Sequence, residues 1–230
     1  MIKNVFLDLD DTILDFQKGE RKAIKCTFEQ MGLPADESII ERYIEINLAC
    51  WQALERGEMS RDEVLFGRFE MLFKELSFTA SVTEAQDIYE ALLCREHDFI
   101  PGANELLLQF EDCKRYDLYM ATNGIIRVQK PRIKDSDIGK FFKAIFISEE
   151  IGYAKPKKEY FDACFKQIEG FNLYETIIVG DSMTSDILGG RNAGILTCHF
   201  NRWNKPYGKV KPDYTISNLS ELIPLLDSIK

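Results

Sequence analysis

The spacing of apolar residues changes along the chain and predicts two kinds of structure. Residues 5–10 form a short apolar run that ends in acids, which is typical of a buried β-strand. From about residue 16 to residue 97 the apolar residues recur instead at helical spacing, as they do over residues 40–54. Sequences of capping-box form at 60–63 and 83–86 mark two helix starts. The pattern therefore predicts an all-helical segment of about four helices.

Strand-like and helix-like patterns alternate in the second half of the chain. Strands are predicted at 117–122, 144–147 and 176–180, with helices at about 102–112, 125–138, 157–169 and 184–193. Such alternation favours a parallel sheet with helices on both faces. The opening strand must join this sheet, because alone it cannot bury its apolar run. We therefore expect an α/β core domain of residues 1–15 and 98–230, with the helical domain 16–97 inserted after the first strand.

Composition and charge exclude several classes of protein. The 230 residues carry a net charge of −9 without a basic stripe, which disfavours binding to a nucleic acid polymer. No apolar run is long enough to span a membrane, and the N-terminus is unlike a signal peptide. The six cysteines are scattered, without a CxxC pair, as is typical of a cytoplasmic protein. With only two histidines, which lie away from the predicted strand ends, any bound metal needs oxygen ligands.

Polar residues collect where the predicted strands end. They are Asp8 and Asp10 after the first strand, Thr122 and Asn123 after the second, Lys155 after the third, and Asp181 and Asp186 after the fourth. The carboxyl ends of parallel strands meet at one edge of a sheet, so we expect one cleft. Carboxylates crowded in this way stay ionised only beside a cation, and oxygen ligands favour Mg²⁺.

This set of groups suits the transfer of a phosphoryl group. The Lys155 ammonium, the Thr122 hydroxyl and the Asn123 backbone N–H would bind its oxygens. A carboxylate must then act as nucleophile, since no suitable Ser–His or Cys–His pair is present, and an aspartyl-phosphate would form and be opened by water. Alternation along a strand points Asp8 and Asp10 to the same side, which suits a nucleophile and an acid/base.

The four signatures, in this order, resemble those of the haloacid dehalogenase superfamily of phosphohydrolases. The resemblance covers the whole chain and implies a Rossmann-like core, with residues 16–97 as the helical cap. It implies that Asp8 is the nucleophile and Asp10 the general acid/base, and that Thr122 and Lys155 bind the phosphoryl group.

The same resemblance implies a metal site. Its ligands would be Asp8, the backbone carbonyl of Asp10, and Asp181, with Asp186 as a weaker or more distant ligand. Mg²⁺ is the expected ion, with Mn²⁺ as a substitute.

A closer similarity is to the YjjG-like pyrimidine 5′-nucleotidase branch, which implies a nucleoside monophosphate as substrate. It depends on Asn47 with Trp51 and on the segments 67–70, 147–152 and 186–190. Asn47 lies on the apolar stripe of its helix, where an unpaired amide is costly. Its amide is either satisfied inside the core or points into the cleft to bind the substrate.

Other functions stay open at this point. The enzyme could be a phosphatase for a small sugar phosphate or phosphoglycolate, or a phosphomutase, and a phosphate-binding protein could retain the same fold. Dehalogenases of the superfamily lack the second aspartate, so Asp10 argues against that activity. The sequence does not distinguish a monomer from a homodimer. Pro131 is expected to break or kink the helix that follows Thr122.

Overall fold

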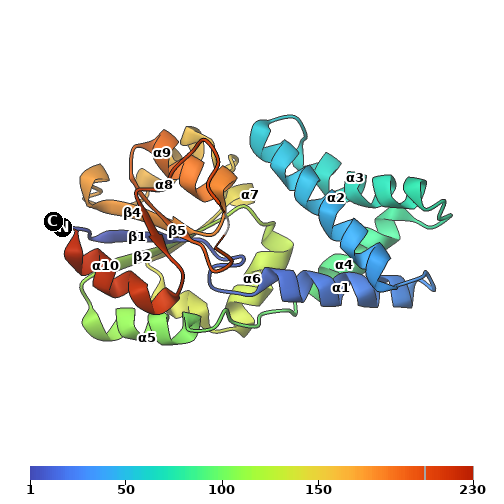
Figure 1. The fold of residues 1–230 in the computed structure, drawn as a ribbon, viewed down its shortest axis with the longest axis horizontal. Helices are drawn as coiled ribbons and strands as arrows, with labels where there is room; N and C mark the ends of the chain where they lie inside the picture. Colours follow the sequence, from blue (N-terminus) through green and yellow to red (C-terminus); the bar gives the residue numbers. More distant parts are fainter. Residues whose placement is uncertain (205, 230) are drawn as a thin grey trace.

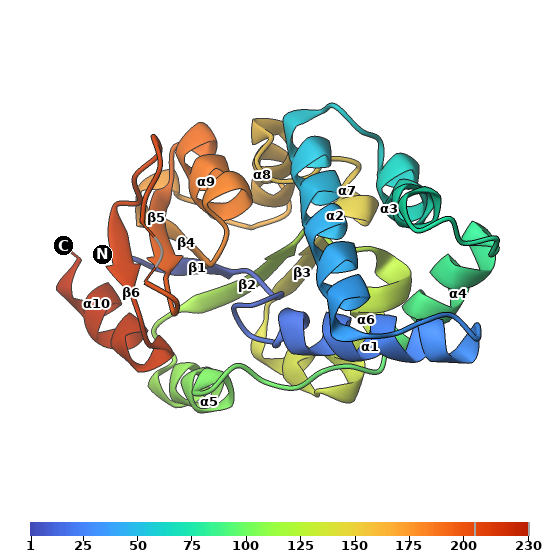
Figure 2. The same cartoon turned by 45° about the vertical axis from the view of Figure 1, so that its right-hand side comes forward.

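A parallel β-sheet forms the centre of the molecule in the computed structural model, which describes residues 1–204 and 206–229. Within these residues the sheet has six strands in the order β3-β2-β1-β4-β5-β6, and every pairing is parallel (Figure 2). Their bounds are β1 Asn4–Leu7, β2 Asp117–Thr122, β3 Ala144–Ile147, β4 Thr176–Gly180, β5 Leu196–Phe200 and β6 Tyr214–Ile216. The predicted parallel sheet is confirmed.

Strand β1 lies in the middle of the sheet and is buried along its whole length. Leu7 pairs with Met120 of β2 on one side and with Val179 of β4 on the other. The backbone N–H of Asp8 then donates to the carbonyl of Val179 at 2.9 Å. Asp8 therefore leaves the sheet at its carboxyl edge, between the ends of β2 and β4.

Helices cover both faces of the sheet, as the sequence predicts. Side chains alternate along β1, so Val5 and Leu7 belong to one apolar cluster and Phe6 to the other. Figure 1 shows α5 (Ala103–Cys113) and α10 (Leu222–Ser228) on the first face, and α8 (Lys158–Phe165) and α9 (Leu188–Ala193) on the second. The remaining core helices are α6 (Ile126–Asp135) and α7 (Ser148–Ile151).

The segment after β1 is helical (Figure 1, right), and its helices share an apolar cluster with Ile125 and Val128 at the start of α6. Its helices are α1 (Phe16–Gln30), α2 (Glu37–Arg56), α3 (Arg61–Glu75) and α4 (Val82–Leu93). Ser60 forms the predicted capping box with Glu63 at the start of α3. Helix α4 begins earlier than predicted, because its cap is Ser81. The division into core 1–15 and 98–230 and helical domain 16–97 stays a prediction.

Two short backbone segments connect the sheet to the helical segment, and they run side by side. The N–H of Asp15 donates to the carbonyl of Asp98 at 2.8 Å, and the N–H of Ile100 donates to that of Ile13 at 2.9 Å. Leu14 and Phe99 form an antiparallel bridge between them. The chain therefore enters and leaves the helical segment through a narrow, paired connection.

The structure also differs from the sequence-based expectation at four further elements. Strands β5 and β6 are not predicted by the sequence pattern. Helix α6 continues through Pro131, so the expectation of a break is wrong, while that of a kink stays a prediction. A turn of π-helix, η3 (Met183–Ile187), precedes α9 where an α-helix was expected from residue 184.

The described residues bear on two expectations drawn from composition, the lack of a membrane span and the state of the cysteines. None of the helices in the described ranges is long and apolar enough to cross a membrane. All six cysteines are free thiols, and three of them are buried.

Gly190 allows α9 to approach the sheet closely, and we expect Gly190→Ala to destabilise the fold. A Cβ at this position would lie 2.5 Å from Cγ2 of Ile178 and 2.6 Å from Cγ2 of Thr197. Overpacking of this kind costs about 1–3 kcal/mol, which equilibrium unfolding in urea would measure. Gly208→Ala is the control, since a Cβ there meets no atom within 4 Å. Equal unfolding midpoints for the two variants would contradict this account.

Candidate active site

The ammonium group of Lys155 lies at the centre of the predicted strand-end cluster. Its Nζ donates to Oδ1 of Asp8, to Oδ1 of Asp186 and to the carbonyl of Ala121, each at 2.6 Å. Lys155 is only 1% exposed. Burial lowers the pKa of Lys155, but the charges of Asp186 and Asp8 outweigh that effect and raise it above its usual value. The lysine therefore stays charged and joins the ends of β1, β2 and β4.

Asn123 fixes the backbone of Lys155 through its side chain. Its Oδ1 accepts from the Lys155 N–H at 2.8 Å, and its Nδ2 donates to the Lys155 carbonyl at 2.9 Å. The sequence indicated only the backbone N–H of Asn123 as a phosphate donor, and that role stays a prediction. The side chain has a second task, which is to hold the lysine at the strand ends.

Three carboxylates form a cluster that could hold a metal ion. Asp8, Asp181 and Asp186 can each offer one oxygen, and these oxygens lie within 4.8 Å of one another. Burial and the charge of Asp186 raise the pKa of Asp8 well above its usual value, although Lys155 opposes this. Burial and the charges of Asp11 and Asp8 raise the pKa of Asp181. One ammonium does not balance three carboxylates, so the cluster favours a divalent cation with oxygen ligands.

The turn after β4 positions the last of these carboxylates. The N–H of Ser182 donates to Oδ2 of Asp186 at 3.0 Å. A Cβ on Gly180 would lie 2.1 Å from the same oxygen, so only glycine leaves room for this carboxylate. His199 Nε2 lies 2.9 Å from the carbonyl oxygen of Asp181. The expectation that both histidines lie away from the strand-end residues is therefore wrong for His199.

Asp10 lies beside this cluster, and its carboxylate has other partners. Its Oδ1 accepts from Nη1 of Arg132 at 2.5 Å, and its Oδ2 accepts from Nε2 of Gln129 at 2.7 Å. The same Nε2 donates to Oγ1 of Thr122 at 2.9 Å. Sequence reasoning missed both α6 residues, because no motif distinguishes them on a helix. Metal binding by Asp10 through its backbone carbonyl stays a prediction.

The amide of Asn47 is paired inside the helical segment. Its Nδ2 donates to Oε1 of Glu20 at 2.5 Å, and its Oδ1 accepts from Nη1 of Arg68 at 2.8 Å. Arg68 is 3% exposed, and its Nη2 donates to Oε1 of Gln86 at 2.8 Å. This pairing satisfies the buried amide, which favours the first of the two alternatives for Asn47. Its part in substrate binding stays a prediction.

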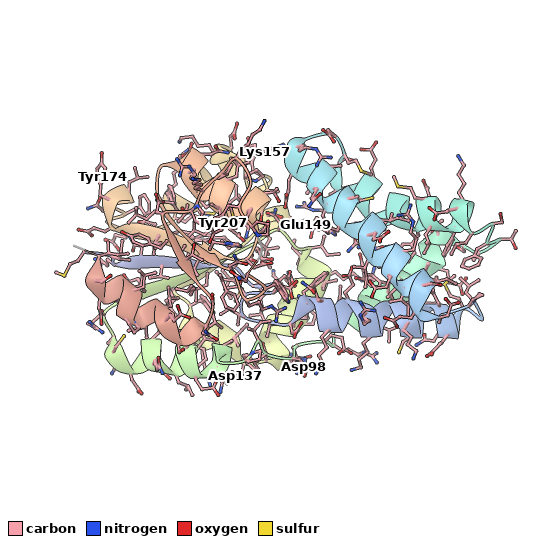
Figure 3. All side chains as sticks on the ribbon, in the orientation of Figure 1. Asp98, Asp137, Glu149, Lys157, Tyr174 and Tyr207 are labelled. Carbon is pink, nitrogen blue, oxygen red and sulfur yellow. The ribbon has the colours of Figure 1, made fainter. Side chains whose placement is uncertain are left out.

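Two residues at the facing ends of α2 and α3 lie near the strand ends, and the sequence did not indicate either. Nη2 of Arg61 donates to Oγ of Ser148 at 2.6 Å, and this hydroxyl donates to the carbonyl of Asn123 at 3.0 Å. Burial raises the pKa of Glu55 to about 7. A hydrogen bond with the Thr184 side chain and the charge of Lys155 oppose this rise, and the charge of Asp186 adds to it. Glu149, labelled in Figure 3, lies at this same junction of the two parts of the molecule.

Comparison with solved structures identifies the class of fold. The crystal structure of the HAD-hydrolase YfnB from Bacillus subtilis, bound to magnesium, superimposes with a TM-score of 0.93 at 40% identity, covering 98% of this chain and 99% of that one. The L-2-haloacid dehalogenase from Xanthobacter autotrophicus shares the fold at a TM-score of 0.79 and 17% identity, with all of both chains covered. The architecture is therefore that of the haloacid dehalogenase type.

The sequence places the chain in a family. The family model for haloacid dehalogenase-like hydrolases matches residues 2–194, and the chain belongs to this family. The pyrimidine 5′-nucleotidase PynA of Streptococcus pneumoniae is 32% identical over 98% of this chain and 95% of its own length. The pyrimidine 5′-nucleotidase YjjG of Escherichia coli is 30% identical over 96% of each. The resemblance stated from the motifs is confirmed, and the protein is a hydrolase.

Glu20 gives the helical segment a pH-dependent stability that Glu20→Gln should remove. Burial raises the pKa of Glu20 from 4.5 to about 7, while Asn47 and Arg68 oppose the rise. The folded state keeps a proton that the unfolded chain releases, so this contribution to stability is complete below pH 4.5 and is lost as pH rises through about 7. Glutamine keeps the acceptor for Asn47 and removes the titration.

The measurement is the free energy of unfolding in urea for both proteins at pH 5 and at pH 8. The difference between variant and wild type should shift by about 2.5 kcal/mol in favour of the variant over this interval. Parallel pH curves for the two proteins would show that Glu20 does not titrate in this range.

Proposed function

We propose that the protein is a Mg²⁺-dependent phosphomonoester hydrolase that forms an aspartyl-phosphate on Asp8. The observation that carries the proposal is the 2.6 Å contact of Lys155 Nζ with both Asp8 and Asp186, beside a third carboxylate, Asp181. A buried ammonium and a cluster suited to a divalent ion can together bind phosphoryl oxygens next to a carboxylate nucleophile. Membership of the hydrolase family supports the same reaction class.

The first half of the reaction transfers the phosphoryl group to the protein. A carboxylate oxygen of Asp8 forms a bond to phosphorus while the bond from phosphorus to the alcohol oxygen breaks. Asp10 gives its proton to that leaving oxygen. Lys155, the Thr122 hydroxyl and the Asn123 backbone N–H bind the phosphoryl oxygens.

The second half regenerates the nucleophile. Asp10, now without its proton, accepts one from a water molecule as this water attacks phosphorus. The bond between phosphorus and the Asp8 oxygen breaks, and inorganic phosphate leaves. The proton that Asp10 received is the one it donates in the next turnover, so the two aspartates return to their starting state.

The donor set fits a magnesium ion, with Mn²⁺ as a substitute. Asp8, Asp181 and Asp186 offer carboxylate oxygens within 4.8 Å of one another, and the backbone carbonyl of Asp10 would add another oxygen. Bound there, the ion would neutralise the phosphoryl oxygens and reduce their repulsion of the Asp8 carboxylate. Lys155 already supplies one positive charge for that purpose.

The substrate we propose is a pyrimidine nucleoside monophosphate. Support comes from PynA and YjjG, two relatives named as pyrimidine 5′-nucleotidases that are 32% and 30% identical to this chain. A small sugar phosphate is the second candidate, because the glyceraldehyde 3-phosphate phosphatase of Pyrococcus abyssi is 31% identical over 91% of the chain. A cytoplasmic location is part of the proposal and agrees with the six free thiols.

A panel of phosphate esters tests the substrate and the metal together. We expect faster phosphate release from UMP, dUMP and dTMP than from glyceraldehyde 3-phosphate or phosphoglycolate. Complete chelation should abolish release, and Mg²⁺ or Mn²⁺ should restore it, because the carboxylate cluster needs a cation. Faster turnover of the sugar phosphates would favour the second candidate, and full activity without metal would reject the proposed site.

Asp8→Asn tests the nucleophile. The amide is nearly isosteric but does not attack phosphorus, so phosphate release should fall by at least about 1,000-fold. The variant should unfold at a temperature no lower than the wild type in chelator, because burial and Asp186 already disfavour the charged form of Asp8. Asp98→Asn is the control, since this carboxylate is 57% exposed and pairs with Lys18. Equal phosphate release by Asp8→Asn and wild type would exclude the aspartyl-phosphate route.

A further inference from the structure

Gln129 on α6 binds two groups to which the proposed mechanism gives different tasks. Its Nε2 donates to Oδ2 of Asp10 at 2.7 Å and to Oγ1 of Thr122 at 2.9 Å. An amide nitrogen carries two hydrogens, so each of these contacts uses one of them. The acid/base and the phosphate-binding hydroxyl are therefore held by a single amide group.

Arg132 determines which way this amide faces. Its Nη1 donates to Oε1 of Gln129 at 2.7 Å and to Oδ1 of Asp10 at 2.5 Å, and its Nε donates to the carbonyl of Glu96 at 2.7 Å. A guanidinium has only donors, so the amide atom that faces it must be the oxygen. The nitrogen then faces Asp10 and Thr122. Arg132 is 1% exposed, so water does not replace these contacts easily.

Gly124 provides the space in which the amide lies. A Cβ on Gly124 would be 2.1 Å from Nε2 of Gln129 and 2.5 Å from its Cδ. The Gly124 N–H also donates to Oγ1 of Thr122 at 3.1 Å. Any other residue at this position would displace Gln129 and break its contact with Asp10.

These contacts determine what Thr122 can do with its hydroxyl. Its oxygen accepts from Gln129 Nε2 and from the Gly124 N–H, which uses both acceptor positions of a hydroxyl group. The hydroxyl proton is then left to be donated, as binding of a phosphoryl oxygen requires. Gln129 thus makes Thr122 a donor toward the phosphate.

The two oxygens of Asp10 are also distinguished. Oδ1 forms a hydrogen-bonded ion pair with a guanidinium, whereas Oδ2 accepts from a neutral amide, so the Oδ2 contact lacks the attraction between opposite charges. The weaker contact is the easier one to give up, so Oδ2 is the oxygen that exchanges a proton with the leaving group and with water.

We propose that Gln129 is a positioning residue that orients the Asp10 carboxylate and the Thr122 hydroxyl together, and that Arg132 fixes its orientation. This inference rests on the proposed phosphohydrolase function. It predicts that a change at Gln129 impairs proton transfer to the leaving group and phosphate binding at once, while the nucleophile Asp8 is untouched.

Gln129→Glu is the test variant, because it keeps the oxygen that faces Arg132 and replaces the donor with an acceptor. The readout is the first-turnover rate with two esters, measured by rapid mixing with enzyme in excess. The alcohol leaving UMP needs a proton, whereas p-nitrophenolate leaves p-nitrophenyl phosphate without one. We expect a loss of about 100-fold with UMP and of about 10-fold or less with p-nitrophenyl phosphate.

Two further variants distinguish a loss of positioning from a folding defect. Gln129→Met removes the donor without adding a charge and should give the same preference for the aryl ester. Arg127→Gln is the matched control on the same helix. Arg127 is 63% exposed, it pairs with Asp87 and Glu90 of α4, and its removal should keep the wild-type ratio of the two rates. Thermal unfolding of each protein verifies that it is folded.

The outcomes separate the inference from the function on which it rests. If wild type hydrolyses both esters and folded Gln129→Glu or Gln129→Met keeps the wild-type ratio, the positioning role is wrong and the phosphohydrolase function stands. If wild type hydrolyses neither ester, the proposed function fails and this inference fails with it. A selective loss with UMP in the Gln129 variants, together with the wild-type ratio in Arg127→Gln, supports the inference.

Discussion

The charge of Lys155 inside the protein is the constraint on which the site depends. Its ammonium is the shared partner of carboxylates that follow β1 and β4 and of a carbonyl in β2. Removing the lysine would leave buried carboxylates without a compensating charge, and breaking a buried ion pair in this way costs about 3–5 kcal/mol. The lysine is therefore what allows Asp8 and Asp186 to lie close together at the strand ends, and its positive charge is what the proposed phosphoryl site requires.

Much of the fold can be predicted because apolar spacing differs between strands and helices. The bounds of β2 and the strand-end positions of Asp8 and Thr122 follow directly from that spacing. Strand β5 was missed because Thr197 and His199 interrupt its apolar run, and only the packing of the sheet buries these two polar side chains. Helix α6 continues through Pro131, although local propensity disfavours proline inside a helix.

The site could be predicted where its residues follow strands, and not where helices supply them. Topology alone brings Asp8, Lys155 and Asp186 together. The neighbours of Asp10 depend on how α6 packs, and β1 ends at Leu7, so strand alternation does not govern the direction of Asp10. For Asn47 the sequence left two possibilities, because only the packing of α2 and α3 reveals that Arg68 lies opposite its amide.

The paired connection at Leu14 and Phe99 has a consequence for how such proteins diversify. Every ladder of the sheet forms between segments outside the insertion, so none of the sheet pairing depends on the helices between these two crossing points. A different set of helices at this connection would change what packs beside the strand ends, while Asp8 and Lys155 kept their places. Under the proposed function, substrate choice and catalysis could therefore evolve at separate rates within one polypeptide.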